Sequence, residues 1–394
     1  MSKSPSNPSR NVLFLGIVSF LNDISSEIIS PILPMFITLS GGSSLTIGLV
    51  GGLRDGVTSI LKVFCGYWSD RTGKRKRFVV AGYLLSGVFK LLLSLCKGWQ
   101  QILIFASLER VGKGLRTAPR DAIIADSMPR ERGKGFGIHR AFDTAGAIVG
   151  SILVFILFWF LHLNFRIIIF ISALLAFFSL LPLHSVKEEK REGQDITLRM
   201  SFFKTFPSSL KWFIVVSGVF NLSNISYMFF ILRVQEFFLF TKEGVAEVQR
   251  LAVAIPILLY ILFNIFYAGF AIPFGVLSDR VGRKRMLISG YLLFSLISLG
   301  FALFSSLPAF ILLFILYGVV YAIIAGNQRA YIADLSPEQA KATALGIFHT
   351  FSGLCALLAS LLAGFLWHNL TYTATFLYAS IMSALSVILF LVKI

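Results

Sequence analysis

GYWSDRTGKRK at residues 66–76 and GVLSDRVGRKR at residues 275–285 are two versions of one sequence pattern. Each holds a glycine, an aspartate–arginine pair, a second glycine and a run of basic residues at the same spacing. Apolar segments long enough to cross a bilayer flank both stretches. A charged stretch between two apolar segments predicts a short loop on one side of a membrane, and its recurrence predicts that one structural unit occurs twice.

Two further pairs of stretches support the duplication. IIADSMP at 123–129 matches YIADLSP at 331–337, and GIHRAFD at 137–143 matches GIFHTFS at 346–352. Each of the three pairs is separated by 208 or 209 residues. Matches at nearly one separation indicate a parallel duplication, and repeated halves around a site at the membrane midplane are the layout of alternating-access transporters.

The composition indicates a membrane protein. Of the 394 residues, 56% are hydrophobic and 14% are charged, whereas about a quarter of the residues in a soluble domain are charged. We therefore expect the lipid bilayer to solvate much of the surface. The formal net charge is +17, but the basic residues lie in short segments between apolar runs. That arrangement follows the positive-inside rule, so we expect no nucleic-acid partner.

We expect an all-α membrane protein of twelve transmembrane helices in two pseudo-symmetric six-helix bundles. An N-terminal bundle covers 1–184, a cytoplasmic linker containing EEKREGQD covers 185–208, and a C-terminal bundle covers 209–394. The distribution of Lys and Arg places both termini and the linker in the cytoplasm, and predicts a multi-pass protein of the plasma membrane, the inner membrane in a bacterium. The predicted helices lie near 11–38, 45–69, 78–96, 100–127, 136–159, 164–184, 209–233, 250–278, 286–304, 308–334, 342–366 and 372–393.

The repeated loop resembles the signature loop of the major facilitator superfamily, G-x-x-x-D-R-x-G followed by two basic residues, and the resemblance covers essentially the whole chain. It implies two helical bundles about a central cavity. The glycines permit close helix approach and a tight turn, and the aspartate can pair with the basic residues. Arg75 and Lys284 also match the pattern. The residues that we assign to a conformational gate are Gly66, Asp70, Arg71, Gly73, Lys74, Asp126, Gly275, Asp279, Arg280, Gly282 and Arg283.

Two more motifs extend the resemblance. LERVGKGLRTA at 108–118 is similar to the span-four motif R-x-x-Q-G of the family, with Lys113 where glutamine is usual. DTAGAIVGS at 143–151 is similar to the G-x-x-x-G-P motif of exporters, with Ser151 in place of the proline. The stretch GKGLRTAPRDAIIADS resembles a bacterial subgroup of the family, for which drug export and siderophore transport have both been proposed.

Ionisable residues gather in the predicted spans of the first half, where charge is costly and usually functional. Asp23 and Glu27 are four residues apart on one helical face and are our first candidates for proton binding. The full proton-coupling set is Asp23, Glu27, Asp55, Glu109, Arg110 and Asp143. Because a paired buried charge costs less than a lone one, structural pairing of these acids with nearby bases is the alternative interpretation.

The second half carries neutral polar residues at the corresponding places. A shift of 209 residues sets Asn264 opposite Asp55 and Ser352 opposite Asp143, and Asn221 and Asn224 lie where the first half has Asp23. We therefore predict that the first half couples transport to protons and that the second supplies hydrogen bonds. The predicted substrate-binding residues are Lys62, Lys113, Arg116, Arg120, Arg140, Asn224, Asn264 and Arg329.

The sequence thus predicts a secondary active transporter that moves a small organic solute by alternating access. Proton antiport with export is the first expectation, and proton-coupled uptake of an organic anion such as a carboxylate siderophore is the alternative. The bases favour an anionic or zwitterionic solute, with an amphipathic drug-like compound as the second choice. A channel or a membrane sensor is the alternative from another class. We expect a monomer without a cofactor, metal site or enzymatic activity, since no nucleotide-binding or metal motif is present.

Overall fold

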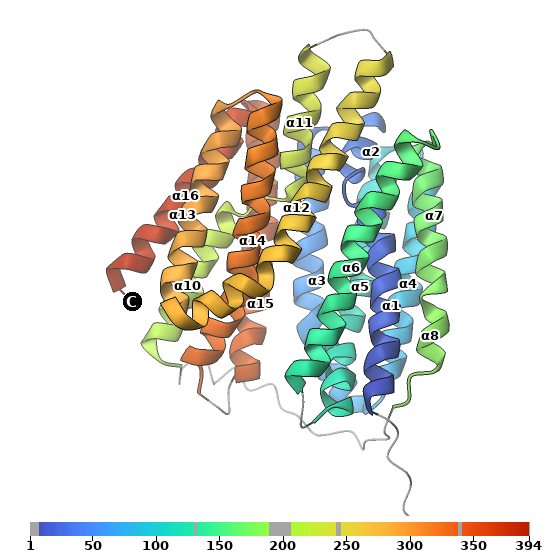
Figure 1. Cartoon of the computed structure of the whole chain (residues 1–394), viewed down its shortest axis with the longest axis vertical. Helices are drawn as coiled ribbons and strands as arrows, with labels where there is room; N and C mark the ends of the chain where they lie inside the picture. The colour runs from blue at the N-terminus through green and yellow to red at the C-terminus, as the bar shows by residue number, and fades with distance from the viewer. Residues whose placement is uncertain (1–7, 130–131, 189–205, 242–245, 338–340, 394) are drawn as a thin grey trace, which may run out of the picture. The chain divides into compact units, whose positions relative to one another are not determined.

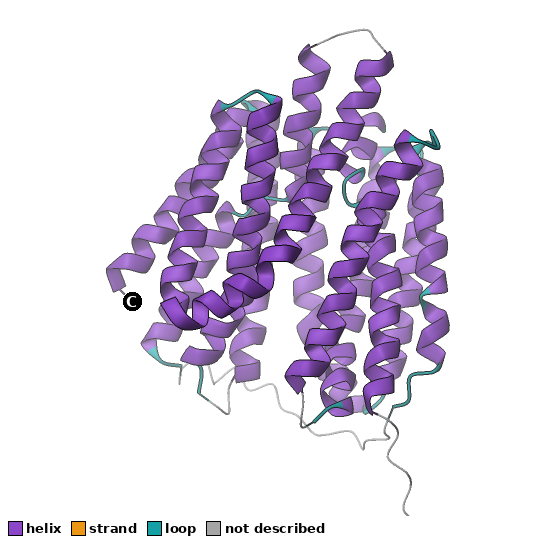
Figure 2. Ribbon diagram, in the orientation of Figure 1, coloured by secondary structure: helices purple, strands orange, loops and turns teal. Residues whose placement is uncertain are grey.

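The structure is a computed structural model that describes residues 8–129, 132–188, 206–241, 246–337 and 341–393. These ranges are built from α-helices and contain no β-strand (Figure 2). Residues 189–205, which make up most of the expected linker, lie outside the described residues. The helices are α1 (Pro8–Ile29), α2 (Leu33–Leu39), α3 (Ser44–Thr72), α4 (Arg75–Ser94), α5 (Trp99–Ser127), α6 (Arg132–Trp159), α7 (Phe165–Phe178), α8 (Leu180–His184), α10 (Ser208–Ser223), α11 (Tyr227–Thr241), α12 (Ala246–Val281), α13 (Arg283–Leu303), α14 (Leu307–Leu335), α15 (Lys341–Asn369) and α16 (Tyr372–Lys393).

The helices confirm the all-α fold with twelve spans. Within the described residues, ten helical stretches are long and apolar enough to cross a membrane. The remaining two expected spans are α3 and α5, each 29 residues long, whose charged side chains keep them outside that group. Three spans are interrupted: α1 continues into α2, α7 into α8, and α10 into α11.

The chain divides into two compact units. The first comprises Met1–Ile32 and Val57–Leu198, and the second comprises Leu33–Gly56 and Arg199–Ile394. The division crosses α3 between Gly56 and Val57, so the first half of this helix packs with the second unit. Residues 33–56 therefore belong to the first half of the sequence repeat but pack within the second compact unit.

Figure 1 labels the helices of both units. In the first unit, glycines bring helices into backbone contact. A Cβ atom added at Gly146 of α6 would lie 2.6 Å from the carbonyl oxygen of Phe20 on α1, and one at Gly150 would lie 2.5 Å from that of Ile24. Gly82 on α4 and Gly112 on α5 approach each other in the same way. Small residues permit this packing in a bilayer, where it replaces hydrophobic association.

In the second unit, a glycine stripe on α3 packs against α15. Gly48, Gly52 and Gly56 are four residues apart and therefore share one helix face. A Cβ atom at Gly52 would lie 2.8 Å from the carbonyl oxygen of Leu357, and one at Gly364 would lie 2.8 Å from that of Ser44. This contact joins a helix of the first sequence repeat to a helix of the second, at the end of α3 remote from the 66–76 loop.

The second glycine of each repeated loop makes a turn that other residues rarely adopt. Gly73 has φ of 64° and Gly282 has φ of 101°, and side chains with a Cβ atom are strained at positive φ. The repeated glycine therefore reverses the chain between α3 and α4 and between α12 and α13.

We predict that Gly52→Leu lowers the thermal unfolding midpoint in detergent, because the new side chain meets backbone atoms of α15 that cannot move aside. Overpacking of this kind costs about 1–3 kcal/mol. Gly269→Leu is the matched control, since an added Cβ there has no atom within 4 Å. Equal midpoints for the two variants would contradict close α3–α15 packing.

We also predict that Gly282→Ala destabilises the protein whereas Gly275→Ala does not. Alanine at position 282 must adopt a strained backbone, which costs on the order of 1–3 kcal/mol. Gly275 lies within α12, has no atom within 4 Å of an added Cβ, and carries no positive φ, so alanine there favours the helix. Thermal unfolding of both variants measures the difference. A larger loss for Gly275→Ala would show that the first glycine, and not the turn, is the constrained position.

Candidate functional site

Each signature loop is closed by one arginine that bridges two aspartates. In the first unit, Arg75 Nε donates to Asp70 Oδ1 over 2.8 Å, and its Nη1 binds the carboxylate of Asp126 at the end of α5. In the second unit, Arg283 Nη2 lies 3.1 Å from Asp279 Oδ1. Its Nε lies 2.5 Å from Oδ2 of Asp334, at the end of α14. Both bridges tie the loop to the fourth helix of the repeat.

The sequence predicted five of these six residues, Arg75 by its match to the loop pattern alone, and missed Asp334. The matched stretches IIADSMP and YIADLSP contained the signal, because they set Asp126 opposite Asp334. The exposed side chains of Arg71, Lys74 and Arg280, which we had assigned to the gate, take no part in the two bridges. Gly66 packs toward α5, where an added Cβ would lie 3.2 Å from Ala118 Cβ, whereas Gly275 faces open space.

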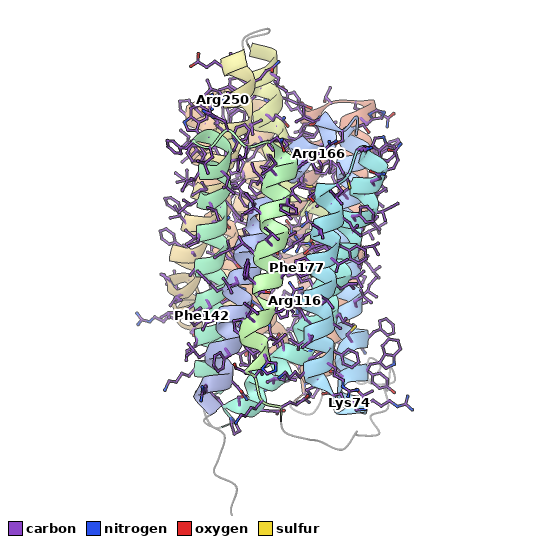
Figure 3. The ribbon with its side chains drawn as sticks, turned by 90° about the vertical axis from the view of Figure 1, so that its right-hand side faces the viewer. Lys74, Arg116, Phe142, Arg166, Phe177 and Arg250 are labelled. Carbon is purple, nitrogen blue, oxygen red and sulfur yellow. The ribbon has the colours of Figure 1, made fainter. Side chains whose placement is uncertain are left out.

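Several charged side chains lie deep in the first unit. Figure 3 shows Arg116 between Lys74, near one end of the helices, and Arg166, near the other. Arg116 Nη1 donates to Ser86 Oγ over 2.7 Å, and its guanidinium lies 4.4 Å from the centre of the Tyr83 ring. The close approach of Gly82 and Gly112 brings α4 and α5 near enough for these contacts.

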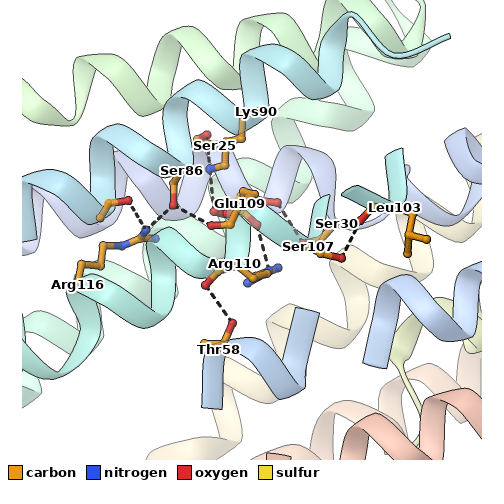
Figure 4. A network of polar contacts seen from close by, with 12 residues as sticks. Ser25, Ser30, Thr58, Ser86, Lys90, Leu103, Ser107, Glu109, Arg110 and Arg116 are labelled. Atoms are coloured by element: carbon orange, nitrogen blue, oxygen red, sulfur yellow. Dashed lines mark hydrogen bonds and ion pairs between the residues drawn. The ribbon is translucent and has the colours of Figure 1, made fainter. Parts of the chain in front are cut away.

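Lys90 is the most deeply buried of these charged residues, with an exposed fraction of 0%. Its Nζ donates to Ser25 Oγ over 2.7 Å and to Ser26 Oγ over 2.9 Å (Figure 4). The hydroxyl of Ser25 in turn donates to the carbonyl oxygen of Ser172 over 2.7 Å. Lys90 therefore joins α4 to α1 and α7, a contact that the predicted site did not include.

Glu109 and Arg110 form a neighbouring ion pair, with 3.1 Å between Arg110 Nε and Glu109 Oε2. The carbonyl oxygen of Arg110 accepts a hydrogen bond of 3.4 Å from Thr58 on α3 (Figure 4). Both charged residues had been assigned to proton coupling, and the structure places them as partners of each other.

Asp23 lies among the charges that the sequence selected. The side chains that act on it electrostatically are Asp143 and the three bases Lys113, Arg116 and Arg120. Gly146 and Gly150 hold α6 against the face of α1 that carries Asp23 and Glu27, since an added Cβ would lie 3.2 Å from Asp23 Cβ and 3.0 Å from Glu27 Cβ. The structure thus brings together two acids and three bases from α1, α5 and α6.

Arg120 of this group also binds side chains outside it. Arg120 Nη2 lies 2.9 Å from Asp121 Oδ1, and its Nη1 donates to Ser19 Oγ over 3.1 Å. Arg140 is exposed, and Lys62 is half-buried on α3. On α6, His139 Nδ1 lies 3.5 Å from Asp143 Oδ2.

The corresponding position of the second unit holds neutral groups. Asn221 Nδ2 donates to Ser352 Oγ over 3.2 Å; the repeat sets Ser352 opposite Asp143, and Asn221 lies in the span that corresponds to that of Asp23. Asn224 accepts a 3.0 Å hydrogen bond from Tyr321 Oη, and Asn264 is buried on α12. Arg329 is exposed, and its Nε donates to the carbonyl oxygen of Ala325 of its own helix over 3.0 Å.

Asp55 does not group with the other acids of the first sequence half. The glycine stripe carries the first half of α3 onto α15, so Asp55 belongs to the second unit. There it is exposed and acts electrostatically on the hydroxyl groups of Tyr317 and Tyr321. In the described part of the chain, no group of three or more His, Cys, Asp or Glu side chains is placed to hold a metal ion.

Comparison with known proteins identifies relatives along the whole chain. It is 56% identical over 384 residues to an uncharacterised MFS-type transporter of Methanocaldococcus jannaschii, which covers 97% of this chain and 94% of that protein. It is also 30% identical over 208 residues to the multidrug resistance protein MdtH of Cronobacter sakazakii, which covers 50% of this chain and 51% of MdtH.

Solved structures agree in fold. The nucleoside transporter NupG superposes with a TM-score of 0.79 at 16% identity, which covers 97% of this chain and 98% of NupG. A bacterial homologue of the lysosomal transporter Spinster, in an inward-facing and occupied conformation, gives a TM-score of 0.74 at 15% identity over 99% of this chain and 97% of that one. The family model of the Major Facilitator Superfamily matches residues 15–257 and 237–394, and this chain, a multi-pass membrane protein of the secondary-transporter class, therefore belongs to that superfamily.

Proposed function

We propose that this protein exports a small organic solute in exchange for protons, by alternating access, and that the group around Asp23 and Asp143 carries the proton. The observation that carries this proposal is the placement of two acids from different helices beside Lys113, Arg116 and Arg120 within the membrane spans. Two carboxylates close together are costly when both are charged, so one proton between them relieves repulsion.

The neighbouring bases make this proton sensitive to conformation. Arg116 and Arg120 are held by Ser86, Asp121 and Ser19. A small relative movement of α1, α5 and α6 changes the distance between the acids and these fixed charges. The free energy of proton binding then differs between conformations, which is what coupling requires.

The gate contacts supply the conformational element. The aspartate–arginine bridges fasten each signature loop to the fourth helix of its repeat, and the α3–α15 glycine contact lies at the opposite end of α3. We propose that release of these contacts accompanies opening at the corresponding side of the membrane. The same proposal includes a monomer in the plasma membrane, with both termini and the 185–208 linker in the cytoplasm.

Export is favoured by the similarity of half of the chain to MdtH, whose name describes multidrug resistance. Proton-coupled uptake of an organic anion, such as a carboxylate siderophore, is the second candidate. It is favoured by Ser151, whose hydroxyl donates to the carbonyl oxygen of Ala147 over 2.7 Å. The helix α6 therefore continues through the position at which the exporter motif has proline.

The test uses the purified full chain in liposomes that enclose a pH-sensitive dye. Pools of organic anions and of cationic drugs are added separately, and proton movement is recorded. Solute-dependent proton flux supports coupled transport, and its sign distinguishes antiport from symport. Saturation and counterflow distinguish a carrier from a channel, and the absence of any solute flux would indicate a sensor.

We predict that Asp23→Asn and Glu27→Gln each abolish proton flux that accompanies the solute, because the amides cannot exchange a proton. Glu247→Gln is the matched control, since Glu247 is exposed in the first turn of α12. Solute transport with unchanged proton flux in both variants would assign coupling to another group or another ion.

We predict that Arg75→Ala lowers both the unfolding midpoint and the transport rate, because Asp70 and Asp126 then lose the guanidinium group that joins them. Loss of a hydrogen bond to a charged group costs on the order of 1.5–3 kcal/mol. Arg71→Ala, which removes an exposed arginine four residues earlier, is expected to behave as wild type. Equal effects of the two changes would mean that the bridge has no role beyond the charge of the loop.

A further inference from the structure

A group of tyrosine rings lies in the second unit, outside the predicted site. We call the tyrosine face the side chains of Tyr227, Tyr260, Tyr267, Tyr317 and Tyr321, from α11, α12 and α14. The ring centres of Tyr317 and Tyr321 are 5.0 Å apart, those of Tyr267 and Tyr321 are 6.1 Å apart, and those of Tyr227 and Tyr260 are 5.5 Å apart. Phe263 lies among them, with its ring centre 4.9 Å from that of Tyr317.

The choice of tyrosine at these places indicates more than packing. The chain has 40 Phe and 11 Tyr, and the tyrosine face takes five of the 11. Phenylalanine would fill the same space without a hydroxyl group, whose burial away from water is costly unless it is hydrogen-bonded. Tyr317 Oη donates to Tyr321 Oη over 3.4 Å, and Tyr321 Oη donates to Asn224 Oδ1 over 3.0 Å. These hydroxyl groups therefore form a chain that ends at Asn224.

Asn224 lies at the interruption of the span formed by α10 and α11. The helix ends at Ser223 and resumes at Tyr227. Side chains from other helices form hydrogen bonds with backbone groups at this interruption. Ser226 N donates to Ser360 Oγ over 3.2 Å, and Tyr378 Oη donates to the carbonyl oxygen of Leu222 over 2.9 Å. Interrupted helices inside transporters are characteristic of solute and ion sites. The interruption is thus stabilised by specific hydrogen bonds and lies beside the tyrosine face.

Asp55 adds a negative charge to the same place. It is exposed on α3 within the second unit and acts electrostatically on the hydroxyl groups of Tyr317 and Tyr321. In the described ranges of the chain, no base lies within ion-pair distance of its carboxylate. A carboxylate at membrane depth is costly unless a cation balances it. In the first unit, the two bases Arg116 and Arg120 already bind protein groups.

We propose that the partly exposed rings of the tyrosine face, those of Tyr227, Tyr267 and Tyr321, bind the transported solute together with Asn224 and Asp55, and that this site selects organic cations with aromatic rings. Tyr260 and Tyr317 are buried and pack against these rings. The face of a tyrosine ring attracts cations, and the ring can stack against an aromatic group of the solute. The carboxylate of Asp55 supplies a negative charge that balances the cation. Asn224 offers an amide for a polar substituent. This inference rests on the proposed transport function and gives its substrate class.

The test measures binding of tetraphenylphosphonium to the full chain in lipid nanodiscs by equilibrium dialysis, with protein-free nanodiscs subtracted. Tetrabutylphosphonium, which has the same charge and no rings, is the comparison probe. We expect saturable binding of the aromatic cation that is at least about tenfold tighter than that of the aliphatic one, which corresponds to about 1.4 kcal/mol. Equal affinities of the two probes would overturn selection for aromatic rings.

Two variants locate the binding. Tyr267→Leu removes a half-buried ring and is expected to weaken binding about five- to thirtyfold, whereas Tyr267→Phe restores most of the affinity because the ring remains. Tyr67→Leu removes a half-buried tyrosine from α3 in the first unit and should leave affinity unchanged. Asp55→Asn is expected to weaken the binding of both cations by the same factor, because it removes the negative charge that both would contact. Unchanged affinity in Tyr267→Leu and Asp55→Asn would overturn the proposed site.

Transport measurements in liposomes separate this inference from the proposed function. Proton-coupled flux of another solute, without saturable binding of tetraphenylphosphonium, would overturn the substrate class and leave the transporter intact. Binding that depends on Tyr267 and Asp55, without any solute-linked flux, would support the site and contradict the transport function. Competition between tetraphenylphosphonium and a transported solute supports both.

Discussion

A bilayer offers no water to charged or polar groups, so every such group within a span must find its partner inside the protein. This constraint accounts for the placement of most polar residues in the structure. Lys90 is fully buried because two serine hydroxyl groups of α1 surround its amine. The same rule explains the stacking of Arg116 on Tyr83 and the pairing of Arg110 with Glu109. Close helix contact at glycine positions is what brings such partners within reach.

The duplication shows how one scaffold can satisfy this constraint in two ways. On the first and fifth helices of each repeat, the first unit has Asp23 and Asp143, and the second has Asn221 and Ser352 in a direct hydrogen bond. A neutral pair is complete without protons or ions. An acidic pair beside bases can exchange a proton with water, whereas a neutral pair cannot, and this difference supports the proposed division between proton coupling and solute binding.

The sequence predicted the fold well because its signals are local or repeated. Apolar lengths marked the twelve spans, and the spacing of glycine, aspartate and arginine marked the loops between α3 and α4 and between α12 and α13. The position of Asp55 could not be predicted in this way, since it depends on which helix the glycine stripe of α3 contacts. The tyrosine face was missed for a related reason. Its five residues are spread over three helices, and each alone is typical of packing.

The two arginine bridges show how a small difference in backbone conformation changes which basic residue pairs with both aspartates. Measured from the loop glycines, Arg75 corresponds to Lys284, yet the residue that binds both aspartates in the second unit is Arg283. In each unit the bridging arginine is the first residue of the following helix. Lys74 precedes α4 as its N-cap with φ of −116°, whereas Gly282 is itself the N-cap of α13 with φ of 101°. The second helix therefore begins one residue earlier, and arginine occupies the first helical position in both units. The bridge thus follows the start of the helix and not the aligned position. A sequence pattern can therefore identify the bridged loop, while the turn geometry determines which basic residue forms the bridge.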